Sequence, residues 1–163
     1  MKWNLDTTHS AAEFAVKHLM ISTVKGRFNT FTGTGETGPD GAIKSAELTI
    51  DAASLSTNVD ARDNHLRSAD FFDVEKFPKI TFKSTKITQA GTDVTITGDL
   101  TIHGITKPVT LKGEVTMPVT DPWGNSRSAL AVTTKINRKD WGLQWNQALT
   151  AGGWVVGDEV QIN

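Results

Sequence analysis

The chain has 163 residues, a formal net charge of −1 and no cysteine. These values exclude disulfides, thiolate metal sites and cysteine catalysis, and they argue against a large basic surface for nucleic acid. Hydrophobic residues make up 37% of the chain and charged residues 21%, which predicts a single packed domain over residues 1–163.

The apolar runs are too short for an integral membrane segment, because Gly, Thr, Asp and Lys interrupt each of them. The first residues also lack the apolar run of a signal peptide. We therefore expect a cytoplasmic protein from the sequence as given, or a periplasmic one if a signal has been removed.

Residues 10–20 are the first segment with an ambiguous pattern. Good helix formers fill it, and Ser10 and Glu13 have the spacing of a capping box. The segment also alternates as a strand does, with one set of side chains at every second position: Ala12, Phe14, Val16 and His18. The residues alone leave helix and strand open.

Period-two alternation dominates the rest of the chain and predicts strands. The alternating runs cover residues 24–31, 46–51, 80–83, 94–103, 109–117, 130–136 and 155–162. Turn-forming residues lie between several of them, at 38–41, 90–93, 103–106 and 121–125. Short connections favour antiparallel neighbours, so about eight strands are expected to form a barrel or a sandwich.

The stretch from Arg62 to Asp73 breaks this alternation with charges, one histidine and two adjacent phenylalanines. It predicts one or two short helical turns at about residues 61–73, which Asp60 or Asp63 could cap. Such an insert would either plug the end of the β-structure or frame the mouth of a site.

No catalytic or metal-binding motif is apparent. Residues 33–38 spell GxGxxG, but a turn and a further strand follow where a dinucleotide site needs a helix. The four histidines show no zinc-ligand spacing. Asp63, His65 and Ser68 are the least implausible catalytic cluster, although they lack the features of a relay.

The aromatic residues have two interpretations. They either fill the core, or some of them line a hollow barrel that holds an apolar ligand. In the second case small residues facing inward would leave room for the ligand, and the candidates are Ala12, Gly26, Ala46, Gly98 and Gly113.

Several long motifs closely resemble the YceI-like family, in the right order and over essentially the whole chain. They are Asp6–Ser10 with Phe14, Val16 and His18, then Gly26–Phe28, Arg62–Phe72, Phe77–Phe82, Gly98–Val109, Arg138–Gly142 and Val156–Val160.

The resemblance implies an all-β fold, an extended eight-stranded antiparallel lipocalin-like barrel with a short helical insert. It also favours a strand for much of residues 11–19. It implies non-catalytic binding, storage or transport of a long-chain amphiphile in the barrel, such as a quinone, polyprenyl lipid, fatty acid or amide. No cofactor and no metal are expected beyond that lipid.

We predict three groups of ligand-binding residues. The cavity lining is expected to comprise Phe14, Val16, Phe28, Leu48, Ile50, Phe82, Leu100 and Ile102. Leu66, Phe71 and Phe72 would close or narrow one end from the insert. Arg27, Arg62, His65 and His18 would meet a polar head group or fix the insert by hydrogen bonds, and a structural role for Arg62 and Asp63 is an equal alternative because buried charges need partners.

Two other functions stay open at this point. One is a structural or stress-related barrel without bound lipid, and the less favoured one is a hydrolase that acts on an amphiphile. An exposed apolar mouth would also make a homodimer plausible.

Overall fold

The structure is a computed structural model, and it describes residues 2–7, 10–18, 22–39, 42–116, 119–120, 122–124, 126–142 and 156–162. Strands dominate this part of the chain, and one α-helix, α1 (Asp60–Arg67), interrupts them. Each described strand pair is antiparallel. The predicted all-β class with a short helical insert is therefore confirmed.

Each alternating run of the sequence overlaps a strand, but the run at 24–31 is divided at Asn29 and Thr30, and several strands lie largely or wholly outside the runs. The described strands are β1 (Lys2–Asn4), β2 (Ala12–His18), β3 (Ser22–Phe28), β4 (Phe31–Thr37), β5 (Ile43–Asp51), β6 (Leu55–Ser56), β7 (Lys79–Ala90), β8 (Asp93–Ile102), β9 (Ile105–Val115), β10 (Val119–Thr120), β11 (Ser126–Arg127), β12 (Leu130–Asn137) and β13 (Val156–Ile162). Two short 3-10 helices complete the described elements, η1 (Ala52–Ser54) and η2 (Arg138–Trp141).

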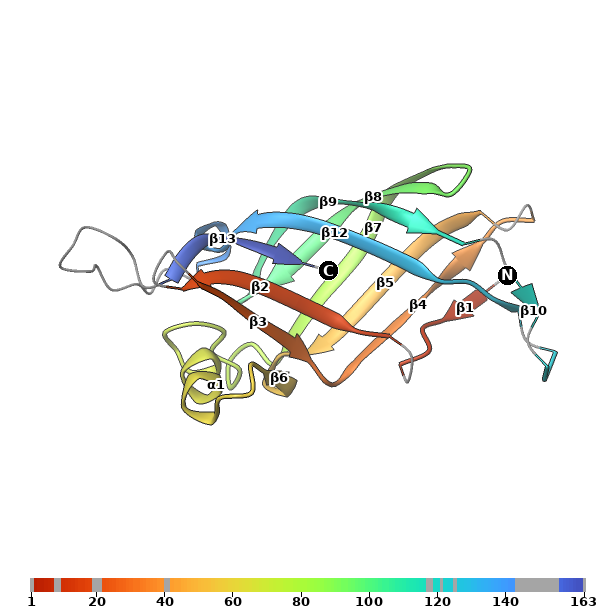
Figure 1. Cartoon of the computed structure of the whole chain (residues 1–163). Coiled ribbons are helices and arrows are strands. Elements are labelled where there is room, and N and C mark those ends of the chain that lie inside the picture. The colour runs from red at the N-terminus through yellow and green to blue at the C-terminus, as the bar shows by residue number, and fades with distance from the viewer. Residues whose placement is uncertain are drawn as a thin grey trace.

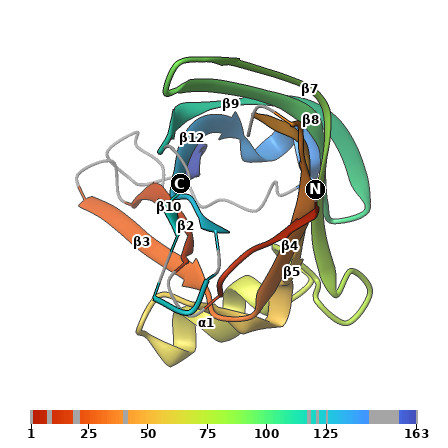
Figure 2. The same ribbon diagram turned by 90° about the vertical axis from the view of Figure 1, so that its right-hand side faces the viewer.

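Eleven strands form one sheet in the order β1-β4-β5-β7-β8-β9-β12-β13-β2-β3-β6. Only Asn29 and Thr30 separate β3 from β4, yet β3 pairs with β2 while β4 pairs with β5. This bent stretch thus joins two distant parts of the sheet order, and the sheet curls around an interior (Figures 1 and 2). Closure into an eight-stranded ring stays a prediction, because β1 and β6 are the outer strands of the described order.

The ambiguous segment at residues 10–20 contains strand β2. Ala12–His18 pairs with β3 along its whole length and with β13 on its other side. Hydrogen bonding on both edges outweighs a local helix preference of a few tenths of a kcal/mol per residue. The strand implied by the family resemblance is therefore confirmed.

One face of the sheet is apolar and points into the curve. Gly33, Leu48, Phe82 and Leu100 form a row of register partners across β4, β5, β7 and β8. The buried core cluster extends this face along the sheet, with Phe28, Phe31, Ile50, Ile80, Val94, Ile96, Ile102, Val109 and Ile136 among its members. Alternation thus places the core on one face.

The glycine-rich residues 33–38 lie mainly in strand β4 and not at the start of a helix. A Cβ atom at Gly33 would lie 3.1 Å from the Leu5 side chain, and one at Gly35 would lie close to the Trp3 ring. The glycines therefore leave space for the side chains of Trp3 in β1 and of Leu5 just after it, and the motif has a packing role.

The predicted room at the inward glycines is wrong at all three, and at Gly113 the backbone of Ala131 in the neighbouring strand fills the space. A Cβ atom at Gly26 would lie 2.4 Å from the Phe14 ring, and one at Gly98 would lie 2.6 Å from the Phe82 ring. Aromatic rings from neighbouring strands occupy the space that the missing side chains leave at Gly26 and Gly98.

No helix among the described residues is long and apolar enough to span a membrane.

Candidate functional site

The insert begins with α1 and continues through turns to Phe72. Figure 1 shows α1 and β6 beside β3, far from β10 and the N-terminus. The N-cap residue of α1 is Val59, which makes no side-chain capping bond, so the predicted cap by Asp60 or Asp63 is wrong. Asp63 instead turns inward, where it is 5% exposed.

Thr57 is the centre of the network that holds the start of the insert. Asp63 Oδ1 accepts hydrogen bonds from the Thr57 backbone N–H, at 2.8 Å, and from the Thr57 hydroxyl. Arg62 Nε donates to the Thr57 hydroxyl oxygen at 2.7 Å, and Arg62 Nη2 donates to the Thr57 carbonyl at 2.9 Å. These bonds give Arg62 and Asp63 a structural role, since both residues bind Thr57 in the loop before the helix.

Arg67 holds the other end of α1. Its Nε donates to the Ala53 carbonyl at 2.9 Å, and its Nη2 donates to the Leu55 carbonyl at 2.8 Å. A guanidinium is suited to this contact because its fork presents several donors in one plane. The helix is thereby tied to η1 and to β6, and β6 pairs with β3 in the sheet.

A chain of aromatic rings connects the insert with the inner face of the sheet. Phe14 and Phe28, from β2 and β3, have ring centroids 5.5 Å apart. Phe72 of the insert meets Phe28 edge to face at 6.0 Å. These separations fall in the favourable range for aromatic pairs. Phe72 therefore continues the apolar inner face into the insert, where Leu66 also packs against the core.

Phe71 takes a different direction from Phe72. Its ring is buried, lies 5.1 Å from the His65 ring, and has the Arg138 guanidinium 5.9 Å from its centroid. His65 Nε2 is 2.8 Å from Asp70 Oδ2, so this histidine pairs with a carboxylate of its own insert. Arg138 is only 3% exposed, which places a buried cation between η2 and the insert.

Helix η2 adds a contact that the sequence does not predict. Trp141 is 3% exposed, and its Nε1 donates to the Leu100 carbonyl at 2.9 Å. The partner lies 41 residues away in the chain. Arg138 directly follows the last residue of β12 and Trp141 ends η2, but nothing in the local sequence indicates Leu100 as the partner of Trp141.

The predicted lining residues lie on the inner face wherever their side chains are described. Phe28, Ile50, Phe82, Leu100 and Ile102 belong to the buried core, while Phe14 and Leu48 pack against it with partial exposure. Val16 and His18 take part in the β2 ladder, and their side chains are outside the described residues.

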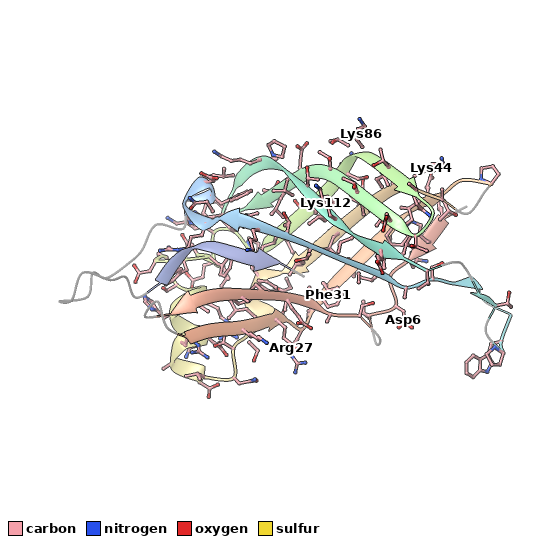
Figure 3. The ribbon with its side chains drawn as sticks, turned by 45° about the horizontal axis from the view of Figure 1, so that its top comes forward. Asp6, Arg27, Phe31, Lys44, Lys86 and Lys112 are labelled. Carbon is pink, nitrogen blue, oxygen red and sulfur yellow. The ribbon has the colours of Figure 1, made fainter. Side chains whose placement is uncertain are left out.

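Arg27, a candidate for a head-group contact, has an exposed side chain on β3, whereas the side chains of Arg62 and His65 are half-buried. Figure 3 shows Arg27 on the outside of the sheet, whereas Phe31 lies within its curve. The structure thus separates Arg27 from the insert, where Arg62 makes part-buried hydrogen bonds and His65 pairs with Asp70.

The possible catalytic trio does not converge. Asp63 binds Thr57, His65 pairs with Asp70, and the Ser68 hydroxyl donates to the His65 carbonyl. Among the described residues no three His, Cys, Asp or Glu side chains gather as metal ligands would.

Parts of the apolar inner face are incompletely covered. Leu48 and Leu111 lie within β5 and β9, and each has a strand neighbour at its own register position. Both side chains are nevertheless only partly buried, as are Ile87 of β7 and Val132 of β12. The curved sheet therefore presents apolar surface that neighbouring side chains do not fully cover.

Comparison with solved structures relates this fold to proteins of several bacteria. BcnA of Burkholderia cenocepacia superposes with a TM-score of 0.83 at 27% identity, over 97% of this chain and 95% of that one. The YceI protein of Campylobacter jejuni superposes with a TM-score of 0.71 at 33% identity, over 86% and 83%. A polyisoprenoid-binding domain of Saccharophagus degradans shares the fold, with a TM-score of 0.66 at 18% identity, over 98% and 92%.

Sequence relatives agree with the structural ones. A UPF0312 protein of Staphylococcus aureus is 40% identical over 163 residues, covering 98% of this chain and 92% of its own. A UPF0312 protein of Vibrio cholerae is 43% identical over 138 residues, covering 83% and 73%. The model of the YceI-like domain matches residues 3–163. The chain therefore belongs to the YceI-like family.

Proposed function

We propose that this protein binds a long-chain amphiphilic lipid, such as an isoprenoid, against the inner face of its curved sheet. The observation that carries the proposal is the incompletely covered apolar surface at Leu48, Ile87, Leu111 and Val132. Uncovered apolar surface is costly in water, at about 25 cal/mol per Å², and a hydrocarbon chain would relieve that cost.

Family membership supports the same ligand class. The Saccharophagus degradans neighbour is described as a polyisoprenoid-binding domain. Its sequence identity of 18% makes it evidence for the fold, so the lipid assignment for this chain depends on the apolar inner face. The dispersed contacts of Asp63, His65 and Ser68 support a binding role without catalysis.

A charge placed on the inner face tests the proposal. Leu48→Glu is expected to weaken binding of a fluorescent geranylgeraniol derivative at least about tenfold, because a carboxylate loses hydration when the chain covers it. The affinity is measured by equilibrium fluorescence titration, and circular dichroism verifies the fold of each variant.

Thr49→Glu is the matched control, since Thr49 is the next residue of β5 and is exposed on the opposite face. It should bind within about twofold of the unmodified protein, as exposed substitutions usually do. Equal affinities of the two folded variants would contradict a lipid site on the inner face.

A further inference from the structure

Strands β9 and β12 pair along only part of their lengths. The ladder joins Lys112–Val115 to Leu130–Thr133 and ends there. Beyond this point β12 pairs with β13 on its other edge, while β9 pairs with β8. If the same register continued, Thr110 would pair with Lys135 and Pro108 would pair with Asn137. No such pairs exist among the described residues.

Pro108 gives a physical reason for this separation. The β8–β9 turn has positive φ at both His103 (55°) and Gly104 (73°), the geometry of a type I′ hairpin. In such a hairpin the pair that closes the turn, Ile102 with Ile105, is hydrogen-bonded. Every second pair along the ladder is then also hydrogen-bonded. Asp99 and Pro108 lie three pairs further along the ladder and therefore form a non-hydrogen-bonded pair. The backbone of Pro108 thus faces β12, and proline has no N–H to donate there.

The side-chain contacts agree with that count. The hydroxyls of Thr101 and Thr106 are 2.7 Å apart, and those of Thr97 and Thr110 are 3.3 Å apart. Such close approach is typical of the non-hydrogen-bonded pairs of an antiparallel ladder. Thr106, Pro108 and Thr110 therefore turn their backbone polar groups away from β8.

A pocket of about 350 Å³ lies where the two strands separate. Val109, Ile136 and Trp141 contribute to its lining, and all three are buried members of the core cluster. Its exposed lining residues include Thr110, Lys135 and Asp140. The volume is within the range of roughly 300–1,000 Å³ typical of ligand pockets.

A second interruption of the sheet, between β5 and β7, is bridged by side chains. The β5–β7 ladder stops at Glu47 and Lys83. Beyond it the Ser84 hydroxyl accepts from the Ala46 N–H at 2.9 Å, and Gln89 Oε1 accepts from the Ile43 N–H at 3.2 Å. The two interruptions thus differ, since side chains span one and a pocket occupies the other.

We propose that the separation between β9 and β12 is a lateral entrance, through which the hydrocarbon chain of an amphiphile reaches the inner face. This inference rests on the proposed function. Val109 and Ile136 belong both to the pocket lining and to the core, so a chain lying in the pocket contacts the same apolar surface. Lys135, Asp140 and Thr110 offer polar contacts to a head group that stays outside.

A hydrocarbon chain suits the pocket better than an added peptide strand. A peptide would require regular donors and acceptors along β9, and Pro108 removes one donor at the centre of that edge. An apolar chain needs only the buried surfaces of Val109, Ile136 and Trp141.

The test is a disulfide across the separation, Thr110→Cys with Lys135→Cys. The chain has no native cysteine, so only one disulfide can form within a molecule, and mass spectrometry of the alkylated monomer verifies it. Uptake of a nitrobenzoxadiazole-labelled geranylgeraniol is followed by stopped-flow fluorescence. The oxidised protein should take up this probe at least about tenfold more slowly than the reduced one.

The matched control is Thr95→Cys with Lys112→Cys, which joins an existing register pair of β8 and β9 without crossing the separation. Oxidation of this control should leave the rate of probe uptake unchanged. Pro108→Val is a second variant that needs no oxidation, because it restores an N–H toward β12 and should also slow uptake.

Equal rates in oxidised and reduced protein, together with unchanged uptake by folded Pro108→Val, would overturn the lateral entrance alone. Failure of the unmodified protein to bind the probe at any concentration would contradict the proposed function itself. Displacement of bound probe by peptides with extended sequences, and not by unlabelled geranylgeraniol, would favour strand addition and overturn the lipid route.

Discussion

At the residue scale, Asp63 shows how a charged side chain of the insert becomes structural. Its position was predicted as part of the insert, and the need for a partner followed from its charge, but the partner could not be identified. Thr57 reaches Asp63 because Asn58 adopts a positive φ of 66° and turns the chain back. Asparagine tolerates that conformation better than most residues. Asn58 is compatible with such a turn, but the sequence does not indicate that the turn brings Thr57 to Asp63.

Removal of the Asp63 carboxylate should destabilise the protein. Asp63→Ala leaves the buried Thr57 N–H without its acceptor, which costs about 1–3 kcal/mol. For a chain of this size that corresponds to a fall of roughly 2–12 °C in Tm, measured by calorimetry. Asp63→Asn retains an oxygen acceptor, so its Tm should fall less than that of Asp63→Ala.

Asp60→Ala is the control, because Asp60 is an exposed residue of the same helix. Its Tm should stay within about 2 °C of the unmodified protein, as surface changes usually cost under 0.5 kcal/mol. A larger loss in Asp60→Ala than in Asp63→Ala would contradict the role assigned to Thr57 and Asp63.

At the scale of elements, alternation and turn chemistry predicted most strands, because their inner faces are apolar. The same reasoning could not decide residues 10–20, where both periods fit and pairing with β3 and β13 selects the strand. It also gave no role to η2, since the Trp141–Leu100 contact depends on the three-dimensional fold. The insert was predicted from the break in alternation, although its N-cap was assigned wrongly.

The insert depends on contacts outside the helix. Helix α1 has eight residues and no side-chain N-cap bond, so its own hydrogen bonds stabilise it only weakly. Arg67→Lys would replace a planar fork by a single ammonium, which cannot reproduce both bonds to Ala53 and Leu55.

We expect Arg67→Lys to raise amide hydrogen exchange in residues 60–72 several-fold, which corresponds to about 1 kcal/mol of local stability, while exchange in β8 is unchanged. Arg27→Lys, an exposed change on β3, is the control and should leave the insert as protected as before. Unchanged exchange in the Arg67 variant would mean that other contacts fix α1.

At the scale of the whole molecule, the family resemblance predicted a lipid-holding barrel, and the structure supplies a curved antiparallel sheet with an apolar inner face (Figure 2). The inner positions of Phe28, Ile50, Phe82, Leu100 and Ile102 follow from alternation. The separation of β9 and β12 could not be predicted, because it depends on which strands become neighbours. Closure of the ring stays a prediction.

Affinity should increase with the length of the hydrocarbon chain. At about 0.3 kcal/mol per atom, each five-carbon unit adds about 1.5 kcal/mol and tightens Kd roughly tenfold. The increase should stop when the chain exceeds the length of strand β8, whose ten residues span roughly 33 Å. Calorimetric titration with prenols of two to eight units measures this dependence, and an affinity independent of length would contradict enclosure of the chain along the sheet.

The most direct test of the lipid proposal is the identity of what the protein carries. Protein purified from its native host without denaturant is extracted with organic solvent, and the extract is analysed by mass spectrometry beside one from the Leu48→Glu variant. We predict a long-chain lipid in the first extract at a substantial fraction of the protein concentration, and its depletion in the second. Equal, trace amounts of lipid in both extracts would contradict the account.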